Sequence, residues 1–95
     1  MIGDDIHKLA QKLWGINRSI TGEGVRETLS LLRQHMPNLE IKSVSSGTKV
    51  FDWTVPREWK VSEAYVIAPN GDRILDFSVN NLHLVGYSVP FQGKL

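Results

Sequence analysis

The stretch EGVRETLSLLRQHMPNLEI, residues 23–41, contains the change of pattern that decides the fold. Its first part carries apolar residues on one helical face: Val25, Leu29, Leu32 and Met36. Pro37 forbids continuation of that helix, because proline has no N–H and clashes with the preceding turn. From Leu39 onward the apolar period falls from about 3.6 residues to about 2, as in strands. The stretch therefore predicts a helix at about residues 23–36 followed by a β-rich region.

A second amphipathic helix is expected before it. One helical stripe near the N-terminus consists of Ile6, Leu9, Ala10, Leu13 and Trp14. Asp4 or Asp5 can accept backbone N–H bonds at its start, and Gly15 suits the position after its last turn. The linker is short and each helix has an apolar face to bury, which predicts a helical hairpin over residues 1–37.

Residues 38–95 contain short strand-like segments separated by turn-forming residues, as in an antiparallel sheet. Strands are expected at residues 39–44, in KVFDWTV (49–55) and in LHLVGYSV (82–89). In AYVIAPNGDRILDF (64–77), Asn70 and Gly71 predict a type I′ hairpin turn that sets Ile67 opposite Ile74. The fold class predicted is α+β, an N-terminal helical hairpin packed on a small antiparallel β-sheet, within a single small domain.

Composition excludes several classes of protein. The 95 residues carry a formal net charge of +1 with acids and bases interspersed, whereas nucleic-acid binders usually show a basic face. No apolar run approaches the roughly 20 residues of a membrane span. The absence of cysteine excludes a disulfide framework and is compatible with a cytoplasmic location. The chain stops straight after strand-like sequence, so we expect it to be part of a longer protein.

The glycine-rich stretch before the second helix, NRSITGEG (17–24), has two interpretations. It lacks the lysine and the Ser/Thr of a phosphate loop, and no strand precedes it. We therefore expect Thr21 or Gly22 to cap the helix, with Glu23 at its positive end. Arg18 beside the free N–H groups keeps an anion site open as the weaker alternative.

Histidines and carboxylates form no recognisable catalytic or metal motif. His7, His35 and His83 come from different predicted elements and lack the spacing that would place two on one helical face. A metal site at His83 and Asp76, or a hydrolase using Asp52 and Asp76, remains a weaker alternative to solvent-facing roles. We therefore expect no cofactor in this chain.

The segment FDWTVPREW, residues 51–59, is dense in aromatic residues. Phe51 and Trp53 share a strand face, so we place both in the core, where aromatic side chains are most often found. Trp59 then remains as an exposed anchor for a carbohydrate or a partner protein.

Four blocks in order carry a resemblance over nearly the whole chain. They are LWGINRSITGEGVRETL, SGTKVFDWTVPREW, AYVIAPNGDRILDF and NNLHLVGYSVP. Together they resemble the N-terminal part of a bacterial family of aminopeptidase-like proteins that carry a domain of unknown function beside a zinc-peptidase-like fold. Gly15 departs from the pattern, since relatives are expected to have proline there.

The resemblance implies zinc for the longer protein, yet no position here matches the family's metal-binding motifs, which lie further downstream. Only the signature residues transfer, without a role: Asn17, Arg18, Ser19, Thr21, Gly22, Glu23 and Gly24. The resemblance implies a non-catalytic accessory portion of a zinc aminopeptidase-like hydrolase, with a structural or substrate-access role and the remainder of that protein as its partner. The alternative is a module that binds carbohydrate or protein through the segment around Trp53 and Trp59. Peptide and carbohydrate are the substrate classes to consider.

Overall fold

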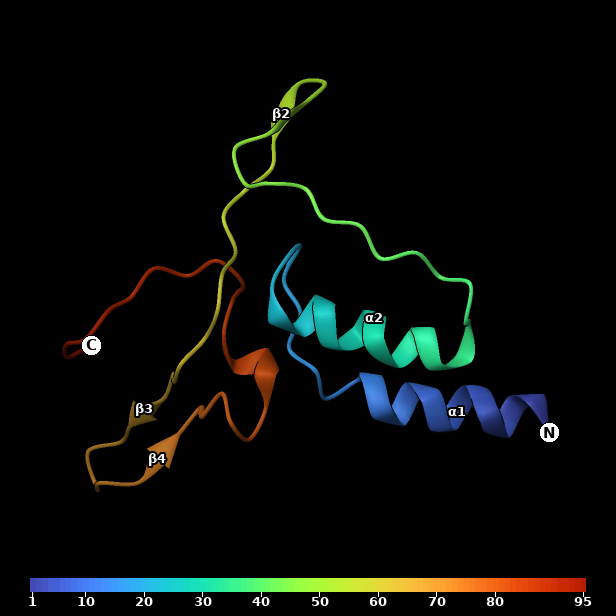
Figure 1. Cartoon of the computed structure of the whole chain (residues 1–95). Coiled ribbons are helices and arrows are strands. Elements are labelled where there is room, and N and C mark those ends of the chain that lie inside the picture. Colours follow the sequence, from blue (N-terminus) through green and yellow to red (C-terminus); the bar gives the residue numbers. More distant parts are fainter. The chain divides into compact units, whose positions relative to one another are not determined.

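The computed structural model describes all residues, 1–95, as two compact units, Met1–Lys60 and Val61–Leu95 (Figure 1). The first unit contains helices α1 (Ile2–Leu13) and α2 (Glu23–His35) and the strands β1 (Lys49–Val50) and β2 (Trp53–Thr54). The second contains β3 (Val66–Ile67), β4 (Arg73–Ile74) and a short 3-10 helix, Asn81–His83. Two helices with small antiparallel sheets confirm the α+β class. The strands form two separate two-stranded sheets, one in each unit.

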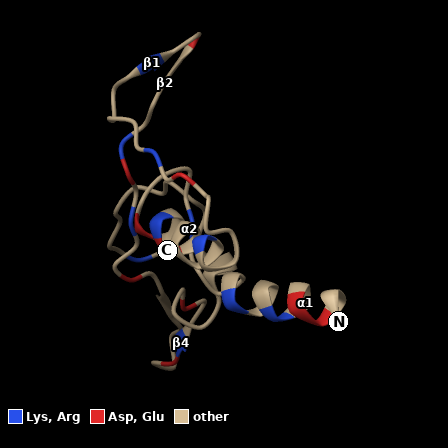
Figure 2. Ribbon diagram, turned by 45° about the vertical axis from the view of Figure 1, so that its right-hand side comes forward, with Lys and Arg blue, Asp and Glu red and all other residues tan.

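Both helices lie where the sequence predicts them, with small differences at their ends. α1 begins at Ile2, so Asp4 and Asp5 lie inside its first turn, and no side chain caps its N-terminal end. Lys12 lies in its last turn, and Figure 2 shows the acids at one end and the bases toward the other. This arrangement complements the helix dipole. α2 begins at Glu23 as predicted and ends one residue early, at His35.

The prediction of one strand over residues 49–55 is wrong, because the chain reverses in its middle. Lys49 pairs with Thr54 and Val50 with Trp53, which leaves Phe51 and Asp52 as a two-residue turn. Phe51 has φ 53° and is 100% exposed, and Trp53 is 47% exposed. Their expected place in the core is therefore also wrong. A residue at the tip of a hairpin has no neighbouring strand over it.

The positive φ of Phe51 gives a testable prediction. Only the first of the two turn residues has positive φ, which is where type II′ turns favour glycine. We expect Phe51→Gly to be more stable than Phe51→Ala by about 1 kcal/mol, because a Cβ is disfavoured at this φ. Urea unfolding of the two variants checks it. Equal stability would mean that the hairpin tip relaxes without strain.

The 64–77 hairpin is present, but its register differs from the prediction by one residue. Val66 pairs with Ile74, and Ile67 pairs with Arg73. Gly71 has φ 90°, while Asn70 does not have the positive φ that a type I′ turn requires. Pro69 explains the difference, because its fixed φ suits the second position of a turn, here closed by the Gly71 amide donating to the Ala68 carbonyl.

The strands expected at residues 39–44 and 82–89 are absent. Residues 39–44 find no partner strand, since the following segment pairs with itself as β1 and β2. In the second case the Asn80 side chain accepts a hydrogen bond from the Leu82 amide and starts the 3-10 helix. A local side-chain bond of this kind competes with strand formation.

Burial of apolar side chains is sparse. Val55 is the only buried hydrophobic residue, at 8% exposure. Its amide donates to the Thr48 carbonyl at 2.9 Å, and its carbonyl accepts from the Gly47 amide at 2.8 Å. These bonds continue the β1–β2 ladder and fix Val55 at the base of the hairpin. The chain thus folds with very little core of its own.

Candidate functional site

The signature loop, residues 17–24, joins α1 to α2 and holds their ends together. One guanidinium nitrogen of Arg18 donates to the Leu13 carbonyl oxygen at 2.9 Å and to Thr28 Oγ1 at 3.1 Å. The Thr28 hydroxyl in turn donates to the Gly24 carbonyl at 2.8 Å. Leu13 ends α1, so its carbonyl has no partner within the helix. Arg18 therefore caps α1 and ties it to α2.

Two glycines of the loop are required for different reasons. Gly22 is buried and is the N-cap residue of α2, with φ 130°, a backbone conformation that side-chain-bearing residues rarely adopt. Gly24 lies inside α2, and a Cβ there would overlap the carbonyl group of Asn17. The close spacing of the two glycines thus reflects one unusual backbone angle and one close backbone approach.

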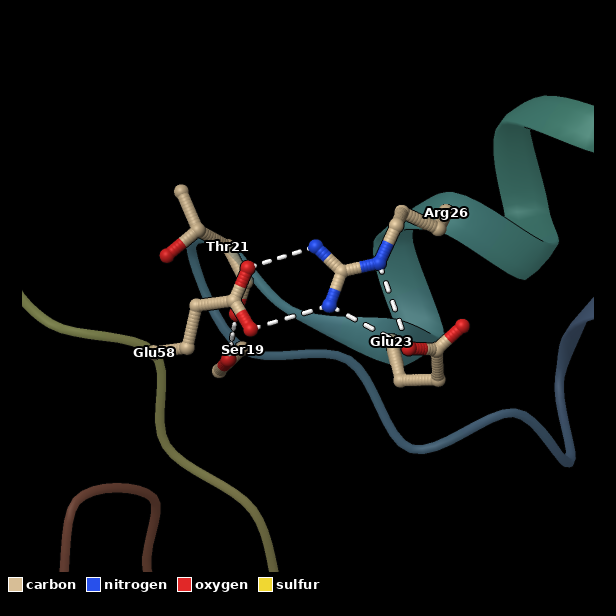
Figure 3. A network of polar contacts seen from close by, with 5 residues as sticks. All are labelled: Ser19, Thr21, Glu23, Arg26 and Glu58. Carbon is tan, nitrogen blue, oxygen red and sulfur yellow. Dashed lines mark hydrogen bonds and ion pairs between the residues drawn. The ribbon is translucent and has the colours of Figure 1, made fainter. Parts of the chain in front are cut away.

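Figure 3 shows a polar contact within the loop, between Ser19 and Thr21. Ser19 Oγ donates to the Thr21 carbonyl oxygen. Thr21 Oγ1 is itself buried and has no hydrogen-bond partner, so it does not cap α2. Of the two residues expected to cap the helix, Gly22 is the one at the N-cap position, and its carbonyl accepts from the Arg26 amide at 3.1 Å.

An ion-pair network connects the start of α2 to the segment that follows β2 (Figure 3). Arg26 donates to both carboxylate oxygens of Glu58, at 2.5 and 2.9 Å. Arg26 Nε also donates to Glu23 Oε2 at 3.2 Å. A guanidinium group that donates two parallel hydrogen bonds to one carboxylate makes a strong and directional contact. Residues 32 apart in sequence are joined in this way.

The hydrogen bonds of this network shift the pKa values of Glu58 and Arg26. The hydrogen bonds from Arg26 lower the pKa of the Glu58 carboxyl below its usual value, and partial desolvation opposes the effect. Glu58 and then Glu23 raise the pKa of the Arg26 guanidinium. Both shifts favour the charged forms of Arg26 and Glu58, so this pair is ionic at neutral pH.

The lowered pKa predicts a pH-dependent contribution to stability. The pKa of Glu58 is lower in the folded state, so its pair with Arg26 stabilises the fold above the ordinary glutamate pKa. This contribution is lost as pH falls through the lowered value. Glu58→Gln should therefore melt at a lower temperature than the wild type at pH 7, by a small margin because both side chains are half exposed.

The measurement is the melting temperature of both proteins as a function of pH. The difference should disappear below the folded-state pKa of Glu58, where the wild-type carboxyl is also neutral. Glu27→Gln is the matched control, because Glu27 lies on α2 with Arg26 but takes no part in the network. A Glu58→Gln deficit that persists unchanged into acid would contradict an ionic origin.

The contact between Arg26 and Glu58 was not predicted from the sequence. Helix spacing could have joined Glu23 to Arg26, since residues three apart lie on one face. No local signal joins Arg26 to a residue in the aromatic segment. Trp59, beside Glu58, is partly covered, and its carbonyl oxygen lies 3.7 Å from where a Gly22 Cβ would stand. Its binding role stays a prediction.

In the second unit, the Asp76 carboxylate is engaged locally. It accepts from the Ser78 hydroxyl at 2.7 Å and the Ser78 amide at 2.9 Å, and Arg73 lies 3.4 Å away. The Ser78 hydrogen bonds lower the pKa of Asp76. His83 Nδ1 lies 3.2 Å from the Asp76 carbonyl oxygen rather than from its carboxylate. The pair meets through the backbone, and no group of three metal-binding side chains gathers in the structure.

The sheet of this second unit also carries a cation–π contact. The guanidinium of Arg73 lies 3.7 Å from the ring centroid of Tyr65. Such a contact contributes about 0.5–1 kcal/mol at an exposed position.

No helix has the length and apolar character needed to cross a bilayer.

The helices and the two small sheets define an α+β protein segment. Its Arg18 and Arg26 side chains bind other residues of the same chain. The chain belongs to the family described as a domain of unknown function, DUF4910, which matches residues 7–93.

A curated protein and a solved structure, both from Clostridium acetobutylicum, are similar to it. One, named "Putative polysaccharide biosynthesis protein with aminopeptidase-like domain", is 54% identical over 88 residues, which are 93% of this chain and 20% of that protein. The other is a crystal structure of a protein called a "putative peptidase", with a TM-score of 0.88 and 53% identity over 95% of this chain and 21% of that one. The chain spans about a fifth of the length of these relatives.

Proposed function

We propose that this chain is a non-catalytic accessory portion of an aminopeptidase-like protein, with a structural or substrate-access role. The observation that carries the proposal is its match, at more than half identity, to a fifth of a protein whose name includes an aminopeptidase-like domain. In the first unit, Arg18 binds the last carbonyl of α1, and Arg26 binds the carboxylate of Glu58 in the same chain. These contacts suit a scaffold.

Zinc and hydrolysis belong, in this proposal, to the part of the longer protein outside these 95 residues. That part would hold the metal and cut peptide substrates. This chain would shape or restrict the approach to it through the signature loop and the β1–β2 hairpin.

The test compares the full-length protein with the isolated chain. Zinc-loaded full-length protein should release the N-terminal residue from a panel of aminoacyl p-nitroanilides, and a chelator should stop the release. The isolated chain should be inactive with and without zinc. Hydrolysis by the 95-residue chain at a rate comparable with the full-length protein would refute the non-catalytic assignment.

A second candidate function rests on the exposed tip of the β1–β2 hairpin. Phe51 is fully exposed there and Trp53 is half exposed, the kind of aromatic surface that stacks on sugar rings or packs on a partner protein. The polysaccharide term in the name of one relative agrees with a carbohydrate ligand. The ligand would be an oligosaccharide.

A glycan array tests this candidate, with Phe51→Ala and Trp59→Ala as variants. Binding lost in Phe51→Ala and kept in Trp59→Ala would locate the contact at the hairpin tip. The reverse would locate it at Trp59. Binding to no glycan would count against the carbohydrate version.

A further inference from the structure

The apolar stripe of α1 is the feature that the polar contacts leave unexplained. It consists of Ile2, Ile6, Leu9 and Leu13, which fall within about 60° of one another at the 100° per residue of an α-helix. The other positions of the helix are charged or polar, except Gly3 and Ala10 beside the stripe. A stripe of this kind normally faces a core.

Coverage of this stripe is uneven along the helix. Leu9 and Leu13, near the signature loop, are partly covered. Ile2 and Ile6, in the first half of α1, are 80% and 63% exposed. The exposed half therefore presents the same helical face that the chain itself begins to cover further along.

The total exposed surface is also too large for the chain to be a complete folding unit. Its accessible area is 8435 Å². Folded monomers follow a mass scaling that gives about 6,600 Å² even for two separate compact bodies of the sizes of the two units. The excess of about 1,800 Å² is roughly twice the area that one partner buries in a standard protein–protein interface.

We infer that the exposed half of the α1 stripe, Ile2 and Ile6, docks on the aminopeptidase-like remainder of the longer polypeptide. This inference rests on the proposed function. The relatives supply an occupant of the required size, because about four-fifths of their length lies outside the segment matched here. Within that segment the fold is shared, with a TM-score of 0.88. In this inference, the remainder of the same polypeptide covers the excess accessible surface of the chain.

The test introduces one negative charge on the stripe and one beside it. Ile6→Asp places a carboxylate on the docking face, and His7→Asp places the same group one residue away, on an exposed face of the same helix. The full-length aminopeptidase-like protein that contains this chain is the sample. Amide hydrogen exchange of residues 2–13 is the measurement, since it reports local opening.

We expect Ile6→Asp to speed exchange across α1 about tenfold in the full-length protein, and His7→Asp to change it less than about twofold. In the isolated chain, where the stripe is already exposed, the two variants should exchange alike. Ile6→Ala, which removes only apolar atoms, should shift exchange in the same direction by a smaller factor.

Equal exchange for both aspartate variants in the full-length protein would overturn the inference. So would a dimer of the isolated chain that Ile6→Asp dissociates, because a second copy would then be the occupant. Hydrolysis by the isolated chain would refute the accessory role while leaving the exchange result intact, so the two failures are distinguishable.

Discussion

Gly24→Ala should destabilise the chain by about 3 kcal/mol, although the same change in an exposed helix normally stabilises by about 1 kcal/mol. The reversal of sign comes from the backbone of the signature loop. The new Cβ would overlap the carbonyl group of Asn17, so either the loop or the first turn of α2 must move. Urea unfolding followed by circular dichroism measures the change.

Gly3→Ala is the matched control for this variant. Gly3 is also helical, and nothing lies within 4 Å of where its Cβ would stand. It should be neutral or more stable than the wild type, by up to about 1 kcal/mol. If both alanine variants gained stability, the close approach of Asn17 to α2 would not exist in solution.

Val55→Asp is expected to cost about 3 kcal/mol or more, because it buries a carboxylate without a partner. Val55 is the buried hydrophobic residue of the chain, and its amide and carbonyl both bond to residues 47–48. The side chain cannot leave this position without breaking the base of the β1–β2 hairpin. A lowered urea midpoint, together with loss of the hairpin's NMR signals, is the expected result.

Val44→Asp is the control of identical chemistry. Val44 is exposed and lies in a segment that forms no strand, so its stability should stay within about 0.5 kcal/mol of the wild type. A large effect at Val44 and a small one at Val55 would mean that the apolar packing lies elsewhere than the structure places it.

The helices were predictable because their signals are local. Apolar spacing gave both, and Pro37 gave the end of the second to within two residues. The same reasoning found the 64–77 hairpin but set its register one residue off. Asn70-Gly71 alone predicts a type I′ turn, whereas the fixed φ of Pro69 selects a different turn, Ala68–Gly71.

The errors elsewhere come from treating alternation as sufficient for a strand. Residues 39–44 alternate but have no partner, and Phe51 alternates with Trp53 yet stands in a turn. Strand formation depends on pairing, which is a non-local property.

The candidate site divides in the same way. The glycines of the signature loop were visible as a local pattern, whereas the bond between Arg26 and Glu58 spans 32 residues and leaves no trace in spacing. Relatives over nearly the whole chain confirm the family resemblance, because several ordered blocks carry more information than any single motif.

The scarcity of buried apolar side chains around Val55 has a calorimetric consequence. The heat capacity of unfolding rises with the apolar area that becomes exposed, and an ordinary domain of this length has about 1.2–1.4 kcal/mol/K. A chain that already exposes most of its isoleucine and phenylalanine side chains has less apolar area to release on unfolding. Its free energy of unfolding should vary weakly with temperature, its melting should be broad, and its slope against urea should be shallow.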